Sequence, residues 1–283
     1  MNTCHWIGIG CMTAFAMGVV LENTALLNVT NDVLTPMEGL THLPKLVHIS
    51  DLHKKQFGAH NCRLLEKTAA QKPEYIVITG DLVSRDVRDF TEAEQLLAGL
   101  CRIAPVVMCI GNHELDLPPH LLERYREMVN RCGVHLLENE TISLGGVRFA
   151  GLRLTAAHYR SASGYRGLAG LTAADITAAL GECQPETVLL CHDPLFMQAF
   201  AEWGAPLVLA GHMHGGVVRL PKIGGLLSPE RKFFPQYDKG RYQMGQTTMI
   251  VSGGLGKLRV ANPSEIRVIS MQQRKSAADD DIS

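Results

Sequence analysis

In this chain, several short apolar runs are followed immediately by residues of types that bind metal ions. They occur in the segments Ser50-Asp51-Leu52-His53, Gly80-Asp81, Gly111-Asn112-His113-Glu114, Cys191-His192 and Gly211-His212-Met213-His214. Two aspartates, an asparagine and several histidines form a donor set that can hold two divalent cations side by side, with positions left for a phosphate. The pattern therefore predicts a two-metal site suited to phosphoester hydrolysis.

The spacing within these segments supports convergence at one site. Asp51 and His53 alternate by two residues, so both can face the same way from an extended backbone, and His212 and His214 do the same. A glycine precedes the candidate ligand in three segments, where the missing Cβ lets the backbone turn sharply. A lone histidine beside a strand is more often structural. The ordered joint occurrence of these segments favours a metal site.

The elements that must position these residues alternate between strands and helices in the first half. Apolar runs predict strands at 46–49, 75–78, 105–110 and 134–137, and helical spacing predicts helices at 62–71, 90–100 and 119–132. This alternation predicts right-handed βαβ crossovers and a largely parallel sheet. Since functional residues of such sheets gather at the carboxyl ends of the strands, the candidate ligands are expected to meet there.

The second half is richer in strands. A hairpin is expected over 141–152, a helix over 172–180 with Thr172 as its N-cap, and strands at 187–190, 207–210, 217–220, 247–251 and 265–270. Residues 231–243 are polar and aromatic without a clear period, which favours a loop that could lie over a site. Two sheets packed face to face, with helices outside, would accommodate both halves.

The composition fits a well-packed α/β protein and gives no strong nucleic-acid signal. The chain has 283 residues, 46% of them hydrophobic, and 27 Lys plus Arg nearly balance 28 Asp plus Glu. None of its eight cysteines has C-x-x-C spacing, which favours a reduced, intracellular-facing protein. Cys109 and Cys191 lie in apolar runs, where a free thiol behaves as a small hydrophobe.

The two ends differ from the rest of the chain. Residues 1–21 carry no formal charge and form a candidate membrane anchor that is short for a bilayer span, and a segment packed on the main domain is the alternative. Residues 22–273 are expected to form one catalytic domain, and 274–283 a solvated acidic tail. Membrane association and a cytoplasmic location both stay open.

The ordered segments resemble the calcineurin-like metallophosphoesterase superfamily over about residues 45–270. The stretch 215–221, Phe234-Pro235 and Gly254-Leu255-Gly256 further resemble its bacterial YkuE-like branch, which includes membrane-associated phosphoesterases and UDP-diacylglucosamine hydrolases. The resemblance implies an α/β fold, a four-layer αββα sandwich of two mixed sheets flanked by helices. It also implies a dinuclear centre of manganese, iron or zinc.

The resemblance further implies a role for each residue. One metal would take Asp51, His53, Asp81 and His214, and the other Asp81, Asn112, His192 and His212, so that Asp81 bridges the pair. A hydroxide bridging both metals would attack phosphorus. His113 resembles the family's general acid, or lies against a phosphate oxygen. Glu114 is expected to be a hydrogen-bond partner rather than a ligand.

Two positions depart from the family pattern. Ser84 stands where many relatives have an aspartate that supports the histidine, and Asp86 is the candidate replacement. Gly253 stands where the branch often has an arginine. The cations that could compensate, each of which is otherwise a solvated surface charge, are Arg85, Arg160, Arg166, Arg219 and Arg231.

The expected reaction is hydrolysis of a phosphomonoester, phosphodiester or pyrophosphate bond in a phosphorylated small molecule or lipid. A lipid-linked or cell-envelope substrate becomes more plausible if residues 1–21 contact a membrane. A non-catalytic scaffold of the same fold is one alternative, although a scaffold would be expected to have lost ligands. A two-metal hydrolase of amide or ester bonds is another, which would need a carboxylate-rich site.

Overall fold

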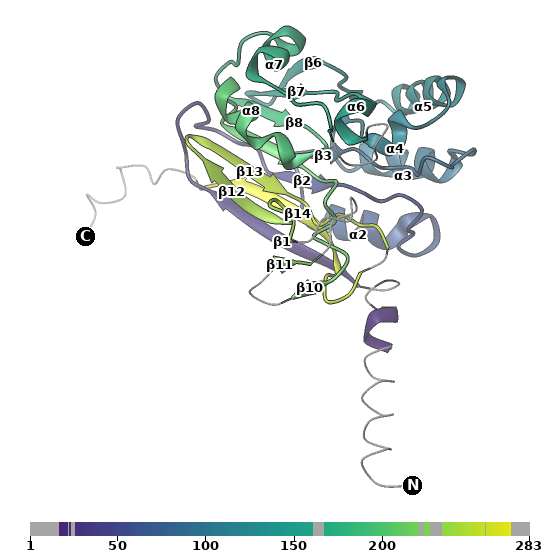
Figure 1. Cartoon of the computed structure of the whole chain (residues 1–283). Helices are drawn as coiled ribbons and strands as arrows, with labels where there is room; N and C mark the ends of the chain where they lie inside the picture. Colours follow the sequence, from purple (N-terminus) through teal and green to yellow (C-terminus); the bar gives the residue numbers. More distant parts are fainter. Residues whose placement is uncertain are drawn as a thin grey trace, which may run out of the picture.

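The computed structural model describes residues 17–21, 23, 26–160, 167–220, 224–226, 234–257 and 259–272. Two mixed six-stranded sheets form its centre (Figure 1). The first sheet has the order β1-β14-β2-β3-β4-β5, and its strands are Leu27–Leu34, Ser264–Met271, Leu46–Ile49, Tyr75–Thr79, Val106–Cys109 and His135–Leu136. Strands β2 to β5 are parallel, whereas β14 is antiparallel to β2 and parallel to β1. The expected parallel sheet is therefore present, with two further strands at one edge.

The second sheet has the order β12-β13-β9-β8-β7-β6. Its strands are Gly240–Met244, Thr247–Val251, Leu207–Ala210, Thr187–Leu190, Val147–Gly151 and Glu140–Leu144. Strands β13, β9, β8 and β7 are parallel, and the two outer strands are antiparallel to their neighbours. The predicted hairpin is formed by β6 and β7. A separate antiparallel pair joins β10 (Arg219–Leu220) to β11 (Gly224–Gly225).

Helices cover the outer face of each sheet (Figure 1). On the first sheet lie α2 (Cys62–Ala70), α3 (Thr91–Cys101) and α5 (Pro119–Arg131), and on the second lie α6 (Ala156–Tyr159), α7 (Ala173–Leu180) and α8 (Met197–Trp203). The short helices α4 (Asn112–Leu115), η1 (Ala59–Asn61) and η2 (Pro194–Phe196) complete the set. The result is the four-layer α/β arrangement expected from the resemblance.

Alternating side chains of the central strands supply two different layers of the core. In β3, Ile76 and Ile78 face the outer helices, while Val77 joins the core between the sheets. In β9, Val208 faces outward, and Leu207 and Leu209 face the other sheet. Since both faces are buried, these strands are continuous apolar runs, which is why the sequence pattern located them well.

Some expected elements differ from the structure. Within 231–243, residues 231–233 lie outside the described residues, and Gly240–Met244 is an edge strand instead of a loop. Its polar, alternating sequence fits an edge strand with one exposed face. Strand β1 was not predicted, because it is only half-buried and half of its residues are polar. Thr172 is the N-cap of α7, as predicted, since its hydroxyl accepts from Asp175 N–H at 3.2 Å.

The ends of the chain lie largely outside the described residues. Residues 1–16 and the whole tail 274–283 are not described, and 17–21 are helical. In the part of the chain that the structure describes, none of the helices is long and apolar enough to cross a membrane. Among the same residues, Cys109 and Cys191 are buried free thiols, as expected for small hydrophobic side chains.

Candidate metal centre

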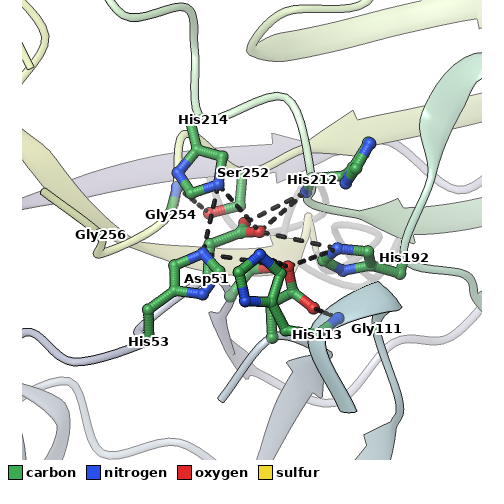
Figure 2. Close-up of polar contacts among 12 residues, drawn as sticks. Asp51, His53, Gly111, His113, His192, His212, His214, Ser252, Gly254 and Gly256 are labelled. Atoms are coloured by element: carbon green, nitrogen blue, oxygen red, sulfur yellow. Dashed lines mark hydrogen bonds and ion pairs between the residues drawn. The ribbon is translucent and has the colours of Figure 1, made fainter. Parts of the chain in front are cut away.

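The candidate ligands follow strands of both sheets and converge where the sheets' carboxyl ends meet. Asp51 and His53 follow β2, Asp81 follows β3, and Asn112 begins α4 after β4. From the second sheet, His192 follows β8, and His212 and His214 follow β9. Figure 2 shows side chains from the two sheets gathered around the Asp51 carboxylate. The structure thus brings together all the residues that the sequence singled out as ligands.

The ligand atoms form three overlapping groups. Within each group all atoms lie within 4.8 Å of one another, and the groups are Asp51, His53 and His214; His53, Asp81 and His113; and Asp81, His192 and His212. Ligands held at about 2.1 Å from one cation lie at most about 4.2 Å apart, so small side-chain shifts would suffice. Because Asp81 and His53 each belong to two groups, the groups form one continuous cluster.

Asp81 lies at the centre of this cluster. Its Oδ2 is 3.2 Å from His192 Nε2 and 3.9 Å from the Nε2 atoms of His53 and His113. Its Oδ1 accepts from the backbone N–H of His113 at 2.8 Å. The Asp81 carboxylate is therefore turned so that one oxygen is held by the backbone and the other faces three imidazole rings.

Asp51, on the other side of the cluster, is also held by a backbone N–H group and faces an imidazole ring. Both of its oxygens accept from His212 N–H, at 3.1 and 3.2 Å, and Oδ1 lies 3.7 Å from His214 Nε2. The rings of His53 and His214 stack at 5.1 Å, with their Nε2 atoms 3.3 Å apart. Two facing imidazole nitrogens can share only one proton, whereas both can donate lone pairs to a cation.

The orientation of Asn112 also fits a cation. Its Oδ1 faces three groups: Asp81 Oδ2 at 3.3 Å, His192 Nε2 at 3.2 Å and His212 Nδ1 at 3.0 Å. Hydrogen bonding alone would favour the rotated amide, whose nitrogen would donate to these atoms. An oxygen among acceptors is the arrangement that a divalent cation stabilises. The residues present therefore fit the expected metals.

A backbone hydrogen bond orients the His192 ring, and the neighbouring carboxylates favour positive charge at it. His192 Nδ1 donates to the Thr79 carbonyl at 2.6 Å, which leaves Nε2 facing the cluster. Burial opposes a charge on His192, but Asp81 and Asp51 outweigh it and raise its pKa to about 10. For Asp81, burial is likewise outweighed by His192, which holds the aspartate's pKa well below its usual range. Positive charge is thus strongly favoured between these carboxylates.

The backbone adopts left-handed φ angles at most of the candidate ligands. The values are 54° for Asp51, 55° for His53, 53° for Asp81, 66° for His212 and 54° for His214. This region costs energy for residues with a Cβ and is concentrated at functional sites. Sequence patterns could not show this feature, because none of these residues is a glycine.

The three glycines before the ligands are explained differently from the prediction. Only Gly80 has a positive φ, of 82°. A Cβ on Gly111 would lie 2.3 Å from Asp81 Oδ1, and one on Gly211 would lie 1.9 Å from Ser50 Oγ. The sharp turn therefore explains Gly80 alone, and close approach of a neighbouring strand's residues explains the other two.

The support expected for His113 also differs. Asp86 forms an exposed ion pair with Lys54, and His113 Nδ1 instead accepts from Arg85 N–H at 3.2 Å. Burial is the main cause that lowers the pKa of His113 to about 4. Glu114 is a hydrogen-bond partner, as expected, since it accepts from the backbone N–H groups of Asp81, Val83 and Gly111.

The cluster lines a cavity of about 230 Å³, and the sequence did not identify all of the cavity's wall as part of the site. That wall contains Tyr159, whose ring lies 5.3 Å from that of His212, and the polar side chains of Arg85, Asp116 and Arg160. Arg85 and Arg160 were two of the five candidate cations. Asp116 and Tyr159 carried no sequence signal, because packing of α4 against α6 brings them here.

Comparison with known proteins agrees with this site. Residues 44–216 match the calcineurin-like phosphoesterase family, so the chain belongs to it. It is therefore a hydrolase, and its Asp and His clusters support a metal-dependent phosphoesterase.

Similarity to individual relatives is moderate. The chain is 28% identical over 241 residues to an uncharacterized metallophosphoesterase of Campylobacter jejuni, covering 82% of this chain and 60% of that protein. It is 24% identical over 227 residues to the phosphodiesterase YaeI of Escherichia coli, covering 76% of each. It is 28% identical over 226 residues to the uncharacterized metallophosphoesterase YkuE of Bacillus subtilis, covering 76% of this chain and 73% of that protein. The chain thus spans less than two thirds of the length of the Campylobacter relative.

Proposed function

We propose that this chain hydrolyses a phosphoester or pyrophosphate bond at two divalent cations. Asp51, His53, Asp81 and His214 would hold one cation, and Asp81, Asn112, His192 and His212 would hold the other. The observation that carries this proposal is the continuous cluster of ligand atoms centred on Asp81, lying in a cavity. Manganese, iron and zinc all suit such a donor set, and manganese is the first to test.

Bound cations would supply Lewis acidity toward the phosphoryl oxygens and would activate water at neutral pH. The chain's own residues orient the reacting groups. His192 keeps its Nε2 toward the cluster because Nδ1 is held by the Thr79 carbonyl. Asp81 and Asp51 are held in place by backbone N–H groups of His113 and His212. The site is therefore pre-organised by backbone contacts from both sheets.

His113 acts in this proposal as a hydrogen-bond donor to a phosphate or leaving-group oxygen. Its Nδ1 is an acceptor for Arg85 N–H, so the proton of the neutral ring lies on Nε2, which faces the cluster. With a pKa of about 4, the ring is neutral at pH 7. A neutral imidazole stabilises developing negative charge by donating a hydrogen bond, and this is favoured over full proton transfer.

Turnover of p-nitrophenyl phosphate and bis(p-nitrophenyl) phosphate with added manganese tests the proposal. We expect the full chain to hydrolyse at least one of them. Asp81→Ala and His192→Ala should each lower the rate 100-fold or more, which corresponds to about 3 kcal/mol in the activation free energy. His120→Ala is a matched control, since His120 is exposed on α5 and lies outside the cluster. Equal activity in His192→Ala and His120→Ala would contradict the assignment.

A lipid-linked or cell-envelope substrate is the finer form of this proposal. Similarity to YkuE supports the bacterial YkuE-like branch, and Met17, Val20 and Leu21 expose apolar side chains at the end of the candidate anchor. We expect the full chain to sediment with phosphatidylglycerol vesicles, and a Met17→Ser, Leu21→Ser variant to sediment less. Equal sedimentation of both proteins would remove the support for a membrane substrate.

The alternative of a non-catalytic scaffold has no observation in its favour. It would require lost ligands, whereas the cluster contains competent side chains at each expected position. An amide or ester hydrolase likewise finds no support in the family match.

A further inference from the structure

Two arginines line the cavity beside the ligand cluster and share one carboxylate. Arg85 follows β3, and Arg160 ends α6. Both bind Asp116, the residue that ends α4: Arg85 NH1 lies 3.0 Å from Asp116 Oδ2, and Arg160 NH2 lies 2.6 Å from Oδ1. We call these three residues the arginine clamp. They line the same cavity as Asp81 and Asn112.

The carboxylate of the arginine clamp explains how two like charges are held together. Asp116 is only 10% exposed, whereas the side chains of Arg85 and Arg160 are 47% and 56% exposed. Each guanidinium has five N–H donors and uses few of them on a single carboxylate oxygen. One carboxylate neutralises one of two positive charges, so the clamp presents one net positive charge to the cavity.

This arrangement differs from an ordinary surface ion pair. The Arg131–Glu94 pair, for comparison, joins one cation to one anion at 3.2 Å, with both side chains well exposed. In the clamp, the two guanidinium groups share one mostly buried carboxylate, and both line the cavity. Arg85 NH2 also lies 3.2 Å from the Asn112 amide atom that faces away from the cluster, which is Nδ2 in the orientation described above. Arg85 therefore lies directly beside the candidate ligand Asn112.

We propose that the arginine clamp binds a second anionic group of the substrate, next to the phosphoryl group that is hydrolysed. Arg160 would contact this second group, Arg85 would lie at the junction with the scissile phosphoryl, and Asp116 is a positioning residue. Guanidinium groups bind phosphate and carboxylate in the same geometry, so either group can be the second anion. The substrate class is then a phosphoester or pyrophosphate that carries two neighbouring negative groups.

The binding of three small phosphonates tests this inference. The inference rests on the proposed function, because that function places the scissile phosphoryl group at the ligand cluster. Methylphosphonate has one anionic group, phosphonoacetate adds a carboxylate, and methylenediphosphonate adds a second phosphonate. Their binding is measured by calorimetry on the full chain loaded with manganese, at a fixed concentration of free metal. Inhibition of p-nitrophenyl phosphate turnover provides a second measurement.

The matched variants are Arg160→Gln and Arg153→Gln. Arg153 is also an exposed arginine, paired with Glu138 at 3.5 Å, but it does not line the cavity. In the wild type and in Arg153→Gln, we expect at least one doubly anionic compound to bind about tenfold or more tightly than methylphosphonate. In Arg160→Gln this ratio should fall close to one. The compound with the larger ratio identifies the second anion as a carboxylate or a phosphate.

A ratio near one in the wild type would overturn the inference, as would a ratio that survives in Arg160→Gln. Comparison between variants at equal free metal cancels any chelation by the phosphonates. Absence of turnover of both p-nitrophenyl phosphate and bis(p-nitrophenyl) phosphate, with a normal binding ratio, would refute the proposed function while supporting the clamp. Turnover with equal binding of singly and doubly anionic compounds would support the proposed function and refute the clamp. Failure of the proposed function and failure of the clamp are therefore distinguishable.

Discussion

Replacing Glu265 by glutamine is expected to destabilise the protein through a buried ion-pair network behind the metal centre. Glu265 lies in β14 and pairs with Lys239 at 2.9 Å and with Arg267 at 3.0 Å. It also accepts from Thr30 Oγ1 at 2.6 Å and from Gly253 N–H at 2.9 Å. The next residue after Gly253 packs against the Asp51 side chain, so the network supports the loop beside the ligands.

The size of the effect follows from the protonation of Glu265. Burial opposes its charge, but Lys239 and Arg267 outweigh burial and lower its pKa to about 2, from an ordinary value of 4.5. At roughly 1.4 kcal/mol for each pH unit, this difference corresponds to about 3 kcal/mol of stability. Because the folded pKa is depressed, this stability is present above about pH 4.5 and is lost as the pH falls toward 2. Removing one partner of a buried ion pair costs a similar amount, about 3–5 kcal/mol.

Urea unfolding of the metal-free protein measures this effect directly. Glu265→Gln should lower the free energy of unfolding by about 3 kcal/mol at pH 7, and the difference from wild type should shrink steadily below pH 4.5. Glu94→Gln is the control, because its exposed pair with Arg131 is expected to contribute less than about 1 kcal/mol. A loss below about 1 kcal/mol, or one that does not change with pH, would refute the reasoning.

Two further substitutions test local contacts. Gly211→Ala should destabilise the fold by about 3 kcal/mol and weaken manganese binding, because the new Cβ would lie 1.9 Å from Ser50 Oγ. Calorimetry measures both effects. Neither should appear in the control Gly170→Ala, since nothing lies within 4 Å of a Cβ placed there. Thr172→Ala should lower the free energy of urea unfolding by about 1 kcal/mol, because Asp175 N–H loses its cap, and an unchanged value would contradict this.

The sequence predicted the central strands and the convergence of the ligands well, for one physical reason. The strands β2, β3, β8 and β9 are buried on both faces, so they are apolar runs that end abruptly at a polar residue. The polar residues that follow them meet at the carboxyl ends of the two sheets.

Features that depend on distant packing were not predictable. Strand β1 pairs with β14, more than 200 residues later, and its half-exposed sequence has no strong strand pattern. The arginine clamp arises because α4 and α6, each only four residues long, pack together. Such short helices lack the periodicity that reveals longer ones. Residues such as Asp116 therefore had no signal in the sequence.

Titration of manganese into the metal-free full chain, followed by electron paramagnetic resonance and elemental analysis, tests the dinuclear centre most directly. The wild type should bind two ions, and their spins should couple because Asp81 would be shared between them. Asp81→Asn should lose at least one ion and all coupling. Binding of at most one ion by the wild type, or two uncoupled ions that persist in Asp81→Asn, would contradict a dinuclear site at this cluster.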